Sequence, residues 1–175
     1  YHEMALELGH WMGRNGHTLI YGGVDAGLMH TVAKAVHDSG GQVVGVITRN
    51  FAPMADRLVD RLITTADLNR PGIQLLGHLE HFDTDRIQVL GISEMALLAE
   101  MPPERRRAAF EIIMSHRVPG VIVAHDQAVM PECIEMAEKY GVSVLTSDMD
   151  TSEFYAQLIG TLRRHLALRQ TIHGV

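Results

Sequence analysis

The sequence predicts a protein of the α/β class, a three-layer sandwich with a mainly parallel sheet of five or six strands. Short runs of β-prone apolar residues alternate with longer stretches whose apolar residues recur at helical spacing along nearly the whole chain. The first two runs, HTLIY (17–21) and QVVGVI (42–47), flank a helical stretch at 27–39. Two strands separated by one helix of this length indicate a βαβ unit, whose strands are parallel.

The first helix is expected over residues 2–14. Met4, Leu8, Trp11 and Met12 fall on one face of this segment, and the Arg-Asn-Gly sequence that follows ends the pattern. An amphipathic opening helix is therefore expected before the first strand.

The helix at 27–39 has Leu28, Val32 and Val36 at helical spacing, and a Ser-Gly-Gly sequence ends it. After the second strand, residues 48–61 lose clean periodicity. We interpret this stretch as a connection.

Beyond the connection the alternation resumes. Residues 64–79 begin with capping residue types and contain a Pro-Gly pair. Strands are expected at 86–91, 120–125 and 142–146, and helices at 92–101, 103–115, 131–140 and about 151–169. In the last helix, Ser152 or Thr151 is expected as the N-cap, with Glu153 in the first turn.

Composition excludes several classes of function. A net charge of −6 with only two lysines, Lys34 and Lys139, argues against broad nucleic-acid binding. No apolar stretch has the ~18 residues of a membrane span. The single cysteine, Cys133, excludes an internal disulfide, fits a reducing compartment, and favours a cytoplasmic location. The missing initiator Met and the abrupt end at Val175 are typical of a fragment.

The stretch YGGVDAGLMH (21–30) raises the question of phosphate binding. Gly22 and Gly23 follow the first strand, and Gly27 opens a helix, where backbone N–H groups and the helix dipole attract anions. The G-G-x-x-x-G spacing matches neither the dinucleotide fingerprint nor the P-loop, and Asp25 would repel a phosphate. The residues alone therefore favour a plain strand-to-helix turn.

The surrounding sequence, GHTLIYGGVDAGLMHTVAKAVHDSGGQVVGVI, resembles the opening of the Lonely Guy family of nucleotide 5′-monophosphate phosphoribohydrolases, over residues 8–51. The resemblance implies that Gly22, Gly23 and Gly27 help to bind a nucleotide phosphate. The P-G-G-x-G-T-x-x-E motif that carries catalysis in that family is absent, because the two Pro-Gly pairs are followed by Ile73 and Val121.

From about residue 58 the chain resembles a different family, the N-terminal domain of HPr kinase/phosphorylase. The matching residues are Thr64, Thr65, Asp67, Leu68, Asn69, Arg70, Pro71, Gly72, Phe82 and Arg86 to Gly91, with AEKYGVSVL (137–145), TSEFYAQLIGTLRRHLA (151–167) and TIHGV (171–175). In that family TIHGV leads into the kinase domain, which holds the P-loop. This sequence has no Gly-Lys-Ser/Thr, since Lys34 follows Ala33 and Lys139 follows Glu138. The resemblance implies a non-catalytic module that helps to assemble or regulate an oligomer, in the context of carbon metabolism.

The two resemblances divide the chain into residues 1–57 and residues 58–175, which we expect to form one continuous domain. Either natural recombination or an engineered fusion would explain their meeting. We favour an engineered chimera.

Other residues have weaker claims to chemistry. His78 and His81 have a spacing that can share a metal on a helix, but an exposed polar helix end is the favoured interpretation. His125 and Asp126 follow a buried-type strand, where ligands gather in parallel sheets, although a dyad is the less favoured interpretation. Cys133 has no evident His partner and is expected to be an ordinary semi-buried thiol.

The leading hypothesis is a non-catalytic regulatory or assembly domain that forms a homo-oligomer. Under this hypothesis we expect no catalytic residues, no metal or cofactor, and no nucleic-acid or membrane partner. Weak binding of an anion or nucleotide phosphate at Gly22, Gly23 and Gly27 without turnover is an intermediate hypothesis. The alternative is a nucleotide 5′-monophosphate phosphoribohydrolase whose active site is completed by a second subunit.

Overall fold

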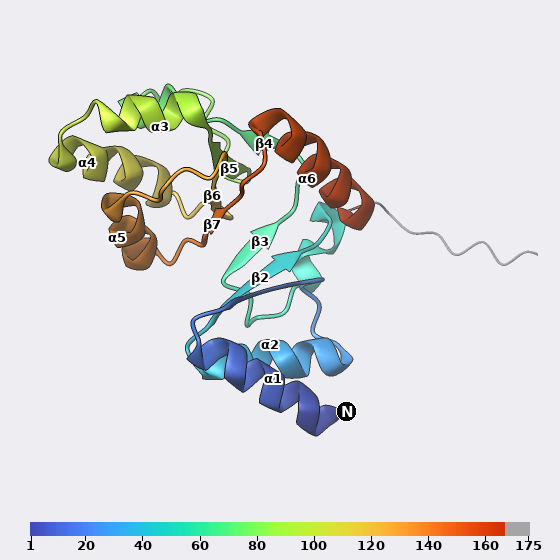
Figure 1. Ribbon diagram of the computed structural model, residues 1–175. Helices are drawn as coiled ribbons and strands as arrows, with labels where there is room; N and C mark the ends of the chain where they lie inside the picture. Colours follow the sequence, from blue (N-terminus) through green and yellow to red (C-terminus); the bar gives the residue numbers. More distant parts are fainter. Residues whose placement is uncertain (167–175) are drawn as a thin grey trace, which may run out of the picture.

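The computed structural model describes residues 1–166, which contain two parallel sheets with helices on their outer faces (Figure 1). The first sheet has the order β1-β2-β3, formed by Thr18–Tyr21, Gln42–Val46 and Arg61–Ile63. The second has the order β4-β5-β6-β7, formed by Leu68–Asn69, Ile87–Leu90, Val121–Val123 and Val144–Thr146. All neighbouring strands in both sheets are parallel.

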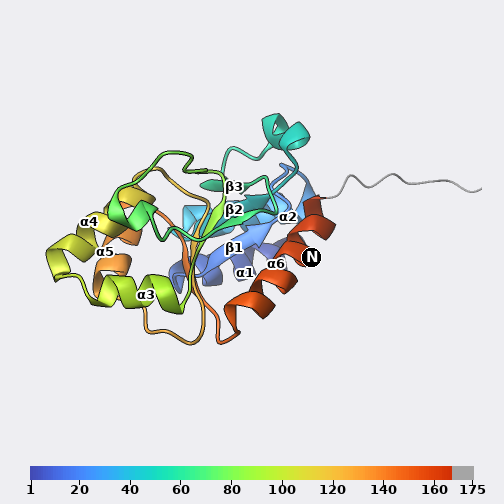
Figure 2. The same cartoon turned by 90° about the horizontal axis from the view of Figure 1, so that it is seen from above.

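The described helices cover the outer faces and one side of the sheets. Helices α1 (His2–Arg14) and α2 (Gly27–Asp38) lie on the first sheet, while α3 (Ile92–Ala99), α4 (Pro103–Met114) and α5 (Pro131–Tyr140) lie on the second (Figures 1 and 2). Helix α6 (Thr151–Leu166) runs beside both sheets, and the 3₁₀ turns are η1 (Arg49–Met54) and η2 (Gln74–Leu76). Within residues 1–166 no helix is both long enough and apolar enough to cross a membrane.

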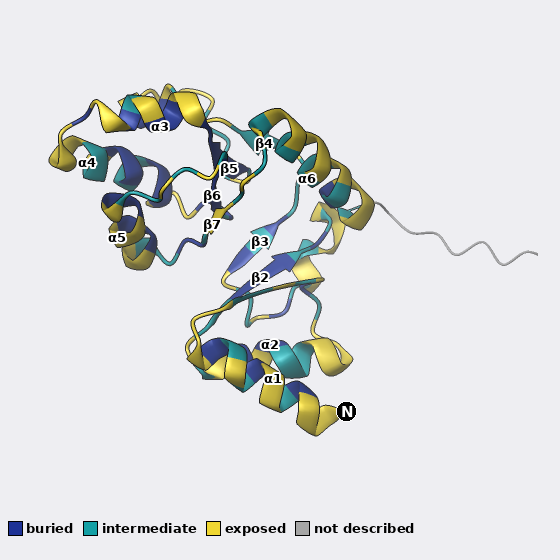
Figure 3. Cartoon of the chain, in the orientation of Figure 1, coloured by how far each residue is buried: buried dark blue, intermediate teal, exposed yellow. Residues whose placement is uncertain are grey.

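The inner faces of the two sheets share one apolar core. Val44 and Ile63 from the first sheet join Ile87, Val89 and Ile122 from the second in a single buried cluster, to which α6 adds Leu162. Figure 3 shows the buried strands between the more exposed helices. Because one face of each sheet is used in this way, α1 to α5 cover the outer faces, whereas α6 packs against the inner cluster.

The predicted α/β class and the parallel strands are confirmed, and the strands expected at 17–21, 42–47, 86–91, 120–125 and 142–146 are present as β1, β2, β5, β6 and β7. Their arrangement differs from one sheet of five or six strands, because two sheets face each other. Strands β3 and β4 were not predicted, because they have three and two residues and are too short to give a periodic pattern. The end of the last helix near residue 169 and the TIHGV segment lie outside the described residues.

Helix α1 is confirmed, but its buried face is not the one that its apolar residues suggest. Ala5, Gly9 and Gly13 are buried, whereas the side of α1 that carries Met4, Leu8 and Trp11 is more than half exposed, each of those residues having an exposed fraction between 51% and 67%. A Cβ added at Gly9 would lie 2.6 Å from both Ala35 Cβ and Val32 O in α2. The two helices approach so closely that only small residues fit between them.

Helix α6 begins at Thr151, so Thr151 and Ser152 are its first helical residues and the predicted N-cap is wrong. The Thr151 N–H donates to His125 Nε2 at 3.0 Å, and His125 Nδ1 lies 3.1 Å from Asp150 Oδ1. Because Nε2 accepts a hydrogen bond, the neutral ring carries its proton on Nδ1 and donates it to Asp150. His125 therefore caps a helix with Asp150, and a dyad with Asp126, already the less favoured interpretation, is not formed.

Replacing Gly9 by Ala tests the close packing of α1 on α2. We expect Gly9→Ala to lower the free energy of unfolding by about 1–3 kcal/mol, because backbone and side-chain atoms of α2 occupy the new methyl's place. Gly160→Ala is the matched control: a Cβ there meets nothing within 4 Å, and the helical propensity of Ala predicts a gain of roughly 0.5–1 kcal/mol. Urea denaturation measures both, and equal effects at the two sites would contradict the packing.

The cap on α6 is tested by comparing His125→Ala with His81→Ala. Both histidines have positive φ, 63° and 61°, so alanine meets the same backbone penalty at each. Only His125 accepts a helix N–H, so its replacement is expected to cost about 1 kcal/mol more. Thermal unfolding followed by circular dichroism measures the difference, and identical losses would show that the cap contributes nothing.

Candidate functional site

The glycine loop after β1 forms the predicted strand-to-helix turn. Gly23 has φ 71°, and a Cβ there would lie 3.1 Å from Gly45 Cα in β2, so the turn packs against the end of the sheet. Positions Gly22 and Gly27 face open space, and Gly27 is the first residue of α2. No side chain caps the N-terminus of this helix. The three glycines thus lie together, and phosphate binding by them stays a prediction.

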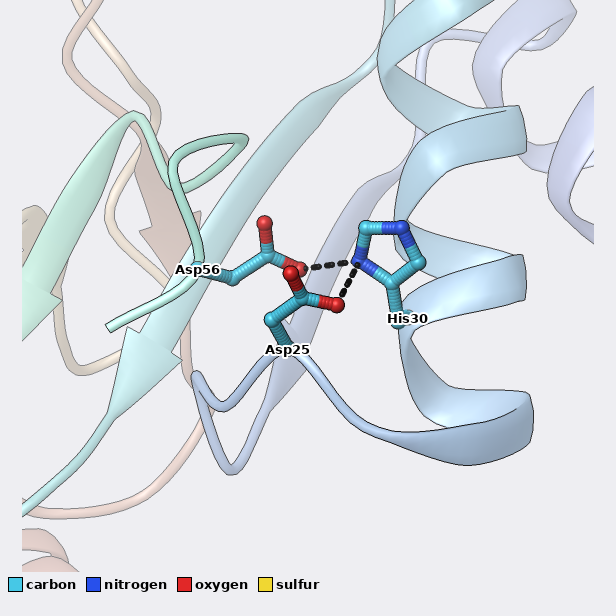
Figure 4. A group of neighbouring side chains, drawn as sticks. All are labelled: Asp25, His30 and Asp56. Carbon is cyan, nitrogen blue, oxygen red and sulfur yellow. Dashed lines mark hydrogen bonds and ion pairs between the residues drawn. The ribbon is translucent and has the colours of Figure 1, made fainter. Parts of the chain in front are cut away.

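Three ionisable side chains meet beside this loop: Asp25, His30 and Asp56 (Figure 4). Asp25 belongs to the loop itself, His30 to the first turns of α2, and Asp56 to the segment after η1. The Nδ1 atom of His30 lies 2.7 Å from Asp56 Oδ2 and 3.1 Å from Asp25 Oδ1. One imidazole nitrogen therefore faces two carboxylates.

Backbone contacts hold the two acidic segments together. Val24 and Ala55 form an isolated antiparallel bridge, and the Asp56 N–H donates to the Gly23 carbonyl at 2.8 Å. The segment carrying Asp56 is thereby fixed against the glycine loop, so the position of both carboxylates follows from the fold.

Asp56 is the buried member of the group, with a side chain only 2% exposed. Burial alone would raise the pKa of its carboxyl, but hydrogen bonds from His30, the Leu58 N–H and the Tyr21 hydroxyl lower it overall. The pKa of Tyr21 is raised, mainly by burial and then by its hydrogen bond to Asp56. At neutral pH Tyr21 is therefore the donor and Asp56 the ionised acceptor, 2.9 Å apart.

The chemistry of this group is that of a cation site more than of an anion site. Two carboxylates repel a phosphate next to the very N–H groups that would otherwise attract it. One nitrogen and two oxygen donors, in contrast, are ligands that Zn²⁺ and similar divalent ions accept.

From the sequence, Asp25 was expected only to repel a phosphate, and no role was predicted for Tyr21, His30 or Asp56. Tyr21 and His30 begin and end the stretch YGGVDAGLMH, so their spacing was visible. Asp56 lies in a stretch without periodicity, 26 residues after His30, and no local signal pairs the two.

The other predicted candidates do not form sites among the described residues. His81 is 92% exposed and its closest acid, Glu80, is 3.7 Å away. The 3₁₀ turn η2 ends at Leu76, so His78 and His81 do not share a helix face. Cys133 is buried, and burial raises the pKa of its thiol to about 12, which keeps it protonated.

An apolar cleft of about 520 Å³ adjoins the glycine loop. It lies between the inner faces of the two sheets and α6, and its apolar walls include Ile20, Val46, Ile122, Leu145, Leu158 and Leu162. Tyr21 and Gly22 also line it. A single residue, Tyr21, thus connects the cleft with the buried carboxylate of Asp56.

The Asn-Arg-Pro-Gly stretch makes its polar contacts inside the fold. Asn69 Nδ2 donates to Gln88 Oε1 at 2.7 Å, and Gln88 is fully buried. Arg70 donates to Glu94 Oε2 at 2.7 Å, and the same oxygen accepts the N–H of Gly91 at the start of α3. These residues join β4, β5 and α3.

Two family models match the chain. The model described as HPr Serine kinase N terminus matches residues 46–162, and the model of the SLOG cluster4 family matches residues 1–76. The first match begins before residue 58, and the two overlap over 46–76. The comparisons thus give no separate boundary at residue 58, and a fusion there stays a prediction.

Curated relatives match about two thirds of this chain. HPr kinase/phosphorylase of Caldicellulosiruptor bescii is 42% identical over 115 residues, covering 66% of this chain and 37% of that protein. The Bacillus subtilis protein of the same name is 32% identical over 117 residues, covering 67% and 38%. The chain thus spans little more than a third of the length of these relatives.

Among solved structures, the molybdenum cofactor carrier protein of Chlamydomonas reinhardtii is 21% identical, with 94% of this chain and 86% of that chain covered and a TM-score of 0.34. The HPr Serine kinase N terminus model covers residues 46–162, more than half of this chain, including the whole second sheet and the Asn69 and Arg70 contacts. On that match, the chain belongs to the HPr Serine kinase N terminus family.

Proposed function

We propose that this chain is a non-catalytic regulatory or assembly domain of an HPr kinase/phosphorylase-type protein. The observation that carries the proposal is the set of contacts made by Asn69 and Arg70, two polar residues that match the family. Asn69 and Arg70 bond to Gln88 and Glu94 within the fold, so their side chains join two strands and a helix.

The lysines support the absence of phosphoryl transfer. Lys34 Nζ is 2.6 Å from Asp38 Oδ2 within α2, and Lys139 Nζ is 2.6 Å from Glu111 Oε1 between α5 and α4. A phosphate clamp needs a lysine that follows a glycine-rich loop and points at the phosphates. Both lysines of this chain are instead at helix surfaces and paired with acids.

An assembly role is supported by the outer face of α1. Met4, Leu8 and Trp11 are 67%, 51% and 54% exposed and lie on one side of the helix, away from the Gly9 contact with α2. Apolar residues gathered on one exposed face mark interaction sites. We infer that a second copy of the chain covers this face in a homo-oligomer.

Nucleotide 5′-monophosphate binding is the second candidate. Its support is the uncapped N-terminus of α2 beside Gly22 and Gly27, both of which face open space, with the cleft adjoining. Asp25 and Asp56 oppose it, because their charges lie beside the same loop. Because these observations oppose one another, weak nucleotide binding without turnover has more support than catalysis, and both have less support than the regulatory or assembly role.

Incubation with AMP tests the absence of catalysis. In buffer that contains a metal chelator, we expect no release of adenine by chromatography and flat calorimetric titrations with millimolar AMP or inorganic phosphate, because two carboxylates adjoin the loop. Gly22→Leu fills the open space at the loop, and Gly160→Leu is its matched control, since a Cβ at either position meets nothing within 4 Å. Adenine release that Gly22→Leu abolishes and Gly160→Leu retains would establish the enzymatic alternative.

Analytical ultracentrifugation tests the assembly role of α1. We expect the wild-type chain to sediment as an oligomer and the double variant Leu8→Glu, Trp11→Glu to sediment as a single chain, because buried charges oppose apolar contact. Ile92→Glu is the control, since Ile92 is similarly exposed, at 55%, but lies on α3. A monomeric wild type, or an oligomer that survives the double variant, would contradict the proposal.

A further inference from the structure

We propose that Asp25, His30 and Asp56 bind one divalent cation of the zinc or manganese class. Their ligand atoms all lie within 4.8 Å of one another. Around a tetrahedral zinc ion with ligand distances of 2.0–2.2 Å, neighbouring ligand atoms are about 3.3 Å apart. The observed separations of 2.7 Å and 3.1 Å from His30 Nδ1 to the two carboxylates approach that spacing. The three ligand atoms are thus close enough for one ion to contact all of them after an adjustment of the side chains.

Charge makes a cation the complement of this group. If His30 Nδ1 carries a proton, this N–H donates mainly to the Asp56 oxygen at 2.7 Å. The Asp25 oxygen, at 3.1 Å, is then only a more distant second acceptor of the same N–H. If it carries none, its lone pair faces two anionic oxygens. A divalent ion satisfies all three atoms together and balances both carboxylate charges.

The surroundings of Asp56 are those of an oriented metal ligand. Its Oδ1 atom accepts the Leu58 N–H at 3.1 Å, while Oδ2 accepts the Tyr21 hydroxyl at 2.9 Å. Outer partners of this kind fix the direction of a ligating carboxylate and tune its affinity for metal. Asp56 is therefore already held in place.

Asp25 gives the site an open side. Its side chain is 68% exposed, against 31% for His30 and 2% for Asp56. Water can therefore occupy the remaining ligand position of the ion on the side of Asp25. Three protein ligands and one solvent position is the arrangement of zinc sites that remain accessible to small molecules.

Calorimetry with Zn²⁺, and electron paramagnetic resonance with Mn²⁺, test this site on the full chain. We expect the number of saturable sites to fall by one in Asp25→Asn and in His30→Gln, with at least a 10- to 100-fold loss of affinity at that site. Tyr21→Phe, which removes an outer partner, should weaken the same site about 10-fold. Asp25→Asn is the decisive variant because Asp25 is exposed, so we expect its replacement to leave the fold intact, which circular dichroism checks.

Two controls separate this site from other acids and histidines. The double variant His78→Gln, His81→Gln removes the histidine pair that the sequence alone offers, and Asp38→Asn removes an exposed acid of α2 that pairs with Lys34. Both should retain the site. Absence of saturable binding, an unchanged site count in Asp25→Asn, or loss of the site in the His78 and His81 variant would each overturn the proposal.

Discussion

The contact between the inner faces of the two sheets is the interaction on which the remaining structure depends. Val44 and Ile63 on one side meet Ile87 and Ile122 on the other, and Leu162 of α6 closes the cluster. Because this contact uses one face of each sheet, the helices must cover the opposite faces, which separates α1 and α2 from α3, α4 and α5 (Figure 1). Toward the edge strands the contact is incomplete, and half-exposed Ile20 and Leu145 line the cleft.

The arrangement of the sheets also determines where Asp25, His30 and Asp56 meet. Parallel strands end together, so the loops after β1 and β2 lie at one edge of the first sheet, where ligand sites of α/β proteins gather. Gly23 allows the first loop to approach the sheet, and the Asp56 N–H bonds to its carbonyl. Tyr21 reaches from β1 to Asp56 and also lines the cleft, so a molecule in the cleft would lie beside the residue that orients the buried carboxylate.

Sequence patterns predicted the elements whose signals are local. The helix at 103–115, bounded by its Pro pair, and the βαβ unit around residues 27–39 follow from spacing that the chain itself displays. The division into two sheets does not follow from such spacing, because it depends on which apolar faces of the strands pack against each other. The buried face of α1 also escaped prediction, since close approach to Ala35 favoured glycine over larger apolar residues. Within the group of Asp25, His30 and Asp56, the first two lie in YGGVDAGLMH, but Asp56 joins them only through tertiary contact.

The negative charges of Asp25 and Asp56 affect both ligands considered for the glycine loop, the divalent cation and the nucleotide phosphate. With neutral His30, the two carboxylates leave the group with two negative charges beside the N-terminus of α2, which opposes a phosphate there. A bound divalent cation would cancel those charges and leave the uncapped helix N-terminus as the dominant local field, which favours an anion. Cation and nucleotide phosphate would then bind with positive coupling, each raising the affinity for the other. A phosphate titration in chelator would therefore probe the loop in its least favourable charge state.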